Sequence, residues 1–213
     1  MRGSINTKGC NETPMSIVVE HAKRRRQILK KALDIFMEEG FEDATFQKIA
    51  DRCKITRTTL YLYFRNKQEI FNFSIKQFMA EVEKDIMGVK EDPSLPYSDK
   101  IRKTLFLILS RLEENRPLLL VILNFLLSKK PTQTGSAPDI RVRRRTIRLR
   151  HILSAMLIEG RKCGQLKKIN VGATNDLFYS LIEAAIFRFA VLKQESTSDI
   201  KEAVEAAVKG IIS

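Results

Sequence analysis

Apolar residues recur every three or four positions along most of the chain, and the strict alternation that is typical of half-buried strands is absent. This pattern predicts a first helix over about residues 20–39, which Gly40 would end. Two short helices should follow, with Thr45 and Thr56 as their N-caps, and then a long helix that Asn66 caps. The sequence therefore predicts an all-α fold.

The stretch EDPSLPYSD, at 91–99, holds two prolines and interrupts the helical pattern. Five more helices are expected beyond or at the edge of this break, over 99–115, 117–129, 139–163, 174–193 and 198–212. With the four helices before the break, the chain should hold about nine. Residues 1–19 are polar at their start and are expected to form a flexible N-terminal tail.

The segment ITRTTLYLYFRNKQEIF, at 55–71, combines small hydroxyls, an arginine and tyrosines within one short helix. Leu60 and Phe64 are four residues apart, so they share a helix face and are expected to point inward. Arg57 would then be exposed, and an arginine can pair with guanine in the major groove. Tyrosine and lysine side chains can bind phosphates, which positions a protein on DNA without reading the bases. This arrangement is typical of a helix-turn-helix.

The longer run TFQKIADRCKITRTTLYLYFRNKQEIF resembles the DNA-binding domain of the TetR family of bacterial transcriptional regulators. The resemblance covers about residues 22–72. Many family members have glycine where this chain has Lys54 and Thr58, and a left-handed Lys54 would cost roughly 1 kcal/mol. The residues that match the family pattern in order and spacing are Thr45, Thr59, Leu60, Tyr61, Tyr63, Phe64 and Lys67.

The resemblance implies a helix-turn-helix DNA-binding domain over 20–68, with the motif itself at about 45–64. The remaining residues, 69–213, would form a larger helical domain for effector binding and dimerisation. The side chains expected to contact DNA are Thr45, Gln47, Lys54, Thr56, Arg57, Thr58, Thr59, Tyr61, Tyr63 and Lys67.

The resemblance also implies a homodimer that binds a palindromic double-stranded operator, usually as a repressor that a small-molecule effector releases. The last two helices carry broad apolar stripes, which favour a four-helix dimer interface. The residues expected there are Leu181, Ala185, Phe189, Val204, Ala207, Val208 and Ile211. The candidates for lining the effector cavity, which are equally good core residues, are Phe106, Leu109, Leu120, Phe125, Met156 and Phe178.

The formal net charge of +13 points to an acidic or polyanionic partner. Residues 20–70 hold 12 Lys and Arg against 8 Asp and Glu, whereas residues 137–168 hold 10 against 2. Six arginines lie in the run Arg141–Arg150. This run suits a solvated helix face, an acidic ligand, an acidic protein partner or peripheral DNA contact. An alternative function is therefore a DNA-bound scaffold that recruits an acidic partner and binds no small ligand.

The chain has three cysteines and two histidines, with neither a CxxC motif nor a paired catalytic arrangement. This argues against a disulfide framework, a metal site, a cofactor site or an enzyme. The longest apolar run, at 118–127, is about half a bilayer span, and nothing resembles a signal peptide. We therefore expect no membrane partner and a cytoplasmic, nucleoid-associated bacterial protein. The basic run KRRR, at 23–26, suits a solvated helix start or phosphate contact.

Overall fold

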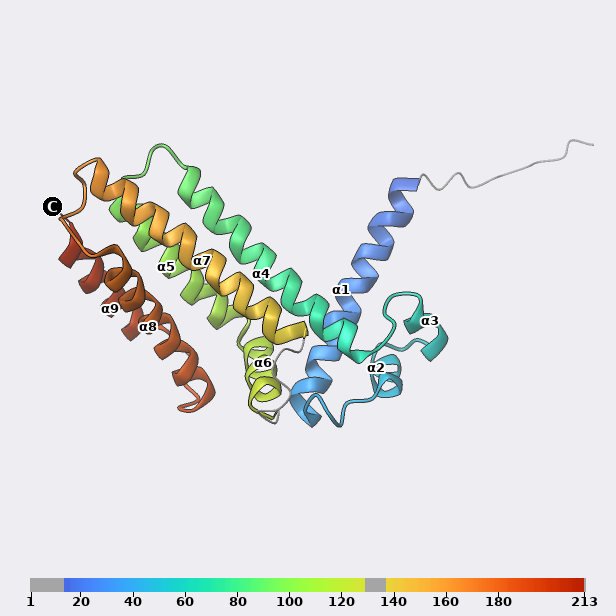
Figure 1. Cartoon of the computed structure of the whole chain (residues 1–213). Helices are drawn as coiled ribbons and strands as arrows, with labels where there is room; N and C mark the ends of the chain where they lie inside the picture. Colours follow the sequence, from blue (N-terminus) through green and yellow to red (C-terminus); the bar gives the residue numbers. More distant parts are fainter. Residues whose placement is uncertain (1–13, 129–136, 213) are drawn as a thin grey trace, which may run out of the picture.

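The structure is a computed structural model that describes residues 14–128 and 137–212. Within these ranges the chain forms nine α-helices and no strand, apart from one isolated antiparallel bridge between Leu166 and Ile212 (Figure 1). The all-α prediction is thus confirmed. Most of the expected N-terminal tail, residues 1–13, lies outside the described residues.

The helices lie close to the ranges expected from the sequence, with three differences. The helix expected over 174–193 covers Val171–Ala190 instead. The first helix begins at Pro14 rather than near residue 20, which is compatible with proline because the first helical turn needs no backbone N–H from it. The third ends at Tyr61 rather than near Phe64. The nine helices are α1 (Pro14–Glu39), α2 (Phe46–Arg52), α3 (Arg57–Tyr61), α4 (Lys67–Glu91), α5 (Tyr97–Glu114), α6 (Arg116–Ser128), α7 (Ala137–Lys162), α8 (Val171–Ala190) and α9 (Ser198–Ile211).

The starts of α2, α3 and α4 are fixed by local side-chain caps. Thr45, Thr56 and Asn66 each accept a hydrogen bond from the backbone N–H three residues further along, at 3.2, 3.0 and 2.8 Å. Each cap satisfies one of the N–H groups that a helix start leaves without a partner. All three predicted caps are confirmed.

The side chains form two hydrophobic cores, and α4 contributes to both. Its first half, including Phe71 and Ile75, packs with α1, α2, α3 and α6. Its second half, including Val82 and Ile86, packs with α5, α7, α8 and α9. Figure 1 shows the same division, with α1, α2 and α3 at one end and α5, α7, α8 and α9 at the other. A displacement of α4 would therefore be felt in both cores.

The apolar stripes of α8 and α9 lie mostly inside one subunit, contrary to the expected intersubunit position. Ala185, Phe189, Val204, Val208 and Ile211 are all buried in the second core, while Leu181 and Ala207 are half-buried. The second core uses these residues because α9 packs on α5 as well as on α8. The exposed apolar and small side chains of the pair are instead Leu177, Ala203, Ala206, Phe187 and Val191.

Candidate nucleic-acid interface

The short helix α3 is held in place by a buried inner face. Leu60 and Phe64 are almost fully buried and pack with Ile49 and Ala50 of α2. An isolated helix of this length would not be stable in water, so this packing is what keeps it folded. The burial of Leu60 and Phe64 confirms the inward face expected from the sequence.

The turn between α2 and α3 depends on a left-handed residue. Lys54 has φ of +55°, and its backbone N–H donates to the carbonyl of Asp51 at 2.9 Å. This conformation costs a residue with a Cβ about 1 kcal/mol. It reverses the chain tightly enough to bring the Thr56 cap directly after α2, and it leaves the Lys54 side chain exposed.

The outer face of α3 presents Arg57, Thr58 and Tyr61 to solvent. The Arg57 guanidinium donates to the Tyr61 hydroxyl at 3.1 Å and lies 5.7 Å from the ring centroid. The hydroxyls of Thr56 and Thr59 are 2.8 Å apart and hydrogen-bond each other. This face therefore offers guanidinium, phenol and hydroxyl groups on a rigid support.

Leu62, which directly follows α3, is 74% exposed and was not expected to belong to the interface. It follows the exposed Tyr61 in the chain and exposes an apolar side chain to solvent. In the sequence Leu62 stands between Tyr61 and Tyr63, and that position alone is compatible with either an exposed or an inward-facing side chain.

The exposed face of α2 is polar, but two of its cations already have partners. Lys48 forms an ion pair with Glu39 at 2.8 Å. Arg52 donates two hydrogen bonds to Glu38, at 3.0 and 2.6 Å, and this contact lowers the pKa of the Glu38 carboxyl. Gln47 donates to Asp51 at 2.8 Å. The Thr45 side chain is exposed at the start of the helix while its oxygen caps it.

Lys67 has a structural role that the sequence did not indicate. Its ammonium donates to the carbonyls of Phe41 and Glu42, at 2.8 and 2.6 Å. The same ammonium lies 4.9 Å from the centroid of the Phe41 ring. These contacts tie the start of α4 to the loop between α1 and α2, so we reassign Lys67 from an expected phosphate contact to a brace inside the domain.

Two further residues of the expected basic and aromatic surface are partly inside the domain. Tyr63 is half-buried and stacks on His21, with ring centroids 4.6 Å apart. Arg25 inserts between Phe64 and Phe73, with its guanidinium carbon 4.7 and 4.0 Å from their centroids. Its Nε is buried and has no hydrogen-bond partner. Arg25 thus packs on the aromatic side chains at the margin of the core and stays partly exposed, whereas Lys23 and Arg26 are exposed.

A second feature, away from α3, is an apolar cavity of about 260 Å³ lined by α4, α5, α6, α7 and α8. The six side chains expected around a cavity are not among those that line it. Leu109, Phe125, Met156 and Phe178 are packed core residues, and Phe106 and Leu120 are half-buried elsewhere. The walls are formed by Ile75, Phe78, Met79, Val82, Ile108, Leu112, Leu119, Ile122, Thr146, Leu149, Tyr179, Ile182, Glu183 and Ile186.

The basic run on α7 is partly neutralised within the chain. Arg148 pairs with Glu83 at 2.6 Å. Arg150 pairs with Asp176 and lies 4.6 Å from the centroid of the Tyr179 ring. Arg144 is exposed. The side chains of the other three arginines in the run, Arg141, Arg143 and Arg145, lie outside the described residues.

In the part of the chain that the structure describes, no three His, Cys, Asp or Glu side chains are grouped as metal ligands would be. Over the same residues, the helices are too short or too polar to cross a bilayer. Of the cysteines, Cys53 is half-buried, and this burial raises the pKa of its thiol. Cys163 is exposed.

The family model described as bacterial regulatory proteins of the tetR family matches residues 28–72, which hold the C-terminal part of α1, all of α2 and α3, and the start of α4. Residues 28–72 therefore form a DNA-binding domain of the TetR family. The matched residues include the two capping threonines, the left-handed Lys54 and the exposed face of α3.

Two curated Bacillus subtilis relatives match this chain over part of their length. The uncharacterized HTH-type transcriptional regulator YhgD is 29% identical over 86 residues, which are 40% of this chain and 44% of YhgD. The fatty acid metabolism regulator protein is 34% identical over 64 residues, which are 28% of this chain and 33% of that protein. The chain thus spans less than half the length of either relative.

The fold is similar over nearly the whole chain. The crystal structure of a TetR transcription regulator from Haloarcula marismortui superimposes with a TM-score of 0.75 at 17% identity, covering 90% of this chain and all of that one. A fatty acid degradation regulator from Bacillus halodurans superimposes with a TM-score of 0.68 at 15% identity, covering 87% and 93%. At these identities the likeness concerns the fold alone.

Proposed function

We propose that this protein is a dimeric, sequence-specific DNA-binding regulator of transcription, and that a small-molecule effector releases it from a palindromic operator. The observation that carries the proposal is the outer face of α3, where Arg57, Thr58 and Tyr61 are exposed on a helix that Leu60 anchors. The match of residues 28–72 to a family of bacterial regulatory proteins supports it.

In this proposal Arg57 and Thr58 reach the base edges in the major groove, where arginine pairs with guanine and threonine meets a thymine methyl or a phosphate. Lys54, Thr56, Thr59, Tyr61 and Tyr63 are positioned around them and would fix the register through phosphates. Thr45 and Gln47 would do the same from the start of α2, where backbone N–H groups favour an anion.

Dimerisation is proposed through the outer face of α8 and α9. Leu177, Phe187 and Val191 are each at least half exposed, and they follow one face of α8 at helical spacing. Ala203 and Ala206 expose small side chains on α9, which permit close helix approach. Two such pairs of helices, one per subunit, would form a four-helix bundle that buries these side chains.

Effector binding is proposed in the apolar cavity. Its walls include Ile75, Phe78, Met79 and Val82 from the middle of α4, and the same helix carries the Lys67 brace at its start. A ligand that fits one position of α4 better than another would shift the spacing of the two α3 helices. Release of a repressor from its operator is the usual outcome of such a shift.

The cavity also favours this function over a DNA-bound scaffold without a ligand. A cavity bounded by five helices and apolar side chains suits a small molecule. The scaffold alternative needs the arginines of α7 to be available to an acidic partner, but Arg148 and Arg150 already pair with Glu83 and Asp176. The sensor therefore has the stronger support.

The proposal is tested by selecting fragments of the source genome on the immobilised full chain and sequencing those that bind. A regulator of this type predicts enrichment of a short palindrome, and anisotropy titration of that palindrome should show one dimer per site. Equal retention of all fragments would show that binding is not sequence-specific and would contradict the proposal.

A further inference from the structure

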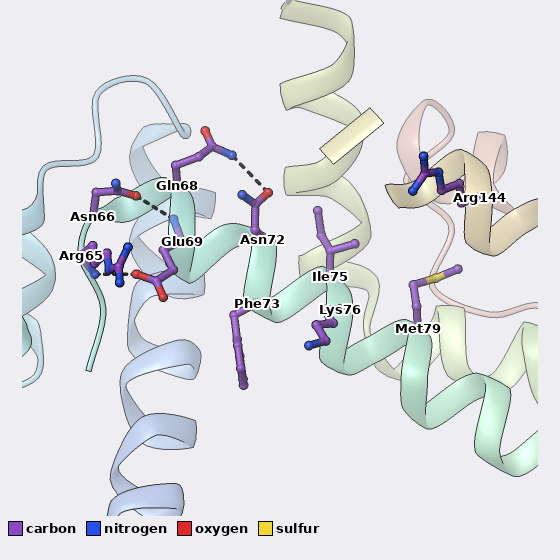
Figure 2. A pocket seen from close by; sticks show the side chains of 10 residues that line it. All are labelled: Arg65, Asn66, Gln68, Glu69, Asn72, Phe73, Ile75, Lys76, Met79 and Arg144. Atoms are coloured by element: carbon purple, nitrogen blue, oxygen red, sulfur yellow. Dashed lines mark hydrogen bonds between the residues drawn. The ribbon is translucent and has the colours of Figure 1, made fainter. Parts of the chain in front are cut away.

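A polar groove of about 740 Å³ lies along the first half of α4, and Arg144 of α7 also lines it (Figure 2). Three cations contribute to it: Arg65, just before α4, Lys76 on α4, and Arg144. All three side chains are exposed. Nothing derived above for DNA binding or dimerisation uses this groove.

The charge in the groove is not balanced within the described residues. No described carboxylate forms an ion pair with Arg65, Lys76 or Arg144. The acidic group that also lines the groove, Glu69, is already engaged: it accepts the Arg65 backbone N–H at 2.6 Å and lies 3.9 Å from the Arg25 guanidinium. The groove thus offers three unpaired cations against one partly compensated acid, which favours an anion.

The groove adjoins the apolar cavity. Ile75 and Met79 line both, so one side of α4 separates a basic surface from an apolar interior. The cavity itself has no basic side chain in its wall, and its one charged residue is Glu183. A site suited to an apolar group and a site suited to an anion therefore lie next to each other, and α4 and α7 contribute residues to both.

We infer that the effector is an amphiphile whose apolar part fills the cavity and whose anionic end, a carboxylate or a phosphate, binds Lys76 and Arg144 in the groove. The inference rests on the proposed effector function and adds its chemical class. The charge of Glu183 opposes an anion at the cavity wall, so the anionic end would be directed past Ile75 and Met79 into the groove.

Such a ligand would also link two helices. An anion held by Lys76 and Arg144 together stabilises whichever arrangement brings the first half of α4 and the start of α7 into reach of one group. Because the first half of α4 packs in the same core as α1, α2 and α3, that preference would be passed to the DNA-binding end. The anionic end thus supplies the differential binding that release requires.

The test uses the full chain and four ten-carbon probes: decanoate, decyl phosphate, decanol and decyltrimethylammonium. Calorimetry should show binding of one or both anions at least about tenfold tighter than decanol, and weaker binding of the cation. Whichever of decanoate and decyl phosphate binds more tightly identifies the anionic group. Equal affinity for decanol and both anions would overturn the inference, as would preference for the cation.

Charge-removing variants locate the anionic end. Lys76→Gln and Arg144→Gln should each weaken binding of the preferred anion by about three- to tenfold and leave decanol affinity unchanged. Lys84→Gln, on the same helix but outside the groove, is the matched control and should bind all probes as the original chain does. Unchanged anion affinity in both groove variants would contradict the assignment.

The same variants separate this inference from the proposed function. Operator affinity without any probe should be the same for Lys76→Gln, Arg144→Gln and the original chain. A loss of operator affinity with a shallower salt dependence would instead make the groove a DNA contact and overturn the ligand assignment. If no operator is recovered at all, the regulatory function fails, whereas calorimetry of the four probes still decides the ligand class.

Discussion

The Lys67 ammonium lies against Phe41, both over its ring, at 4.9 Å, and on its backbone carbonyl, at 2.8 Å. Lys67 is the first residue of α4, and Phe41 lies in the loop that joins α1 to α2. The contact therefore connects the helix that reaches into the second core with the scaffold that carries α3. It gives the domain a rigid link where the sequence pattern alone indicated a phosphate-binding lysine.

Replacing Lys67 with methionine should destabilise the protein by about 1–3 kcal/mol, because two carbonyls lose a charged donor while the packing on Phe41 is kept. Urea unfolding followed by circular dichroism measures this. Lys84→Met removes an exposed lysine from the same helix and should change stability by less than about 0.5 kcal/mol. Unchanged stability in Lys67→Met, together with weaker binding to every DNA sequence, would restore the phosphate role.

Two helical glycines should respond to alanine with opposite signs. A Cβ at Gly160 would lie 2.7 Å from Leu166 Cδ1 and 2.8 Å from Tyr97 Cβ, so Gly160→Ala should cost about 1–3 kcal/mol through overpacking. At Gly88 a Cβ meets nothing within 4 Å, so Gly88→Ala should stabilise by about 0.5–1 kcal/mol through helix propensity. Thermal melts of the two variants check this. A stabilised Gly160→Ala would show that the α7 packing is looser than described.

Phe187→Glu should convert the proposed dimer to a monomer at micromolar concentration. Phe187 is 56% exposed on the outer face of α8, and a charge there would be buried without a partner in a dimer interface. Light scattering coupled to size exclusion gives the mass. Leu127→Glu is the control, since Leu127 is 81% exposed on α6 and lies outside the proposed interface. An intact Phe187→Glu dimer would move the interface elsewhere.

Alkaline pH should destabilise the protein through Tyr179. This phenol is buried beside the apolar cavity and donates to the Thr146 carbonyl at 3.2 Å, and its burial raises its pKa above the ordinary value. The unfolded chain therefore loses this proton first as the pH rises past about 10, and stability falls by up to about 1.4 kcal/mol per pH unit until the folded pKa is reached. Below pH 10 this contribution is fully present.

The comparison that isolates Tyr179 is urea unfolding of the original chain and of Tyr179→Phe at pH 8 and at pH 10.5. The variant lacks the titrating phenol, so its stability should fall less between the two pH values. The other three tyrosines titrate in both proteins and cancel in the difference. Parallel losses of stability in the two proteins would show that the phenol is not held neutral by the fold.

The helix caps and the buried face of α3 could be predicted from the sequence, because the interactions that determine them join residues a few positions apart. Thr45, Thr56 and Asn66 cap N–H groups three positions away, and the turn at Lys54 is formed by residues directly beside it in the chain. Leu60 and Phe64 share a face through helical spacing alone. These features depend on neighbours along the chain, so the pattern determines them.

The brace and the cavity could not be predicted in the same way, because they depend on contacts between distant segments. Lys67 binds carbonyls 26 and 25 residues earlier in the chain. For the cavity, Phe178 and its neighbour Tyr179 are both aromatic and both buried, yet only Tyr179 lines it. The helical periodicity assigns both residues to the interior. Which of them lines the cavity depends on how five helices pack, and the periodicity carries no information on that.

The central claim is that α3 reads DNA sequence through Arg57, and the most direct measurement is the affinity of Arg57→Ala for the recovered operator and for its single-base variants at two salt concentrations. The account predicts a loss of about 1–3 kcal/mol on the operator and relaxed preference at one base pair. Lys103→Ala, an exposed charge on α5, should bind every variant like the original chain. An Arg57→Ala protein that loses the same affinity on every sequence, or none, would contradict the account.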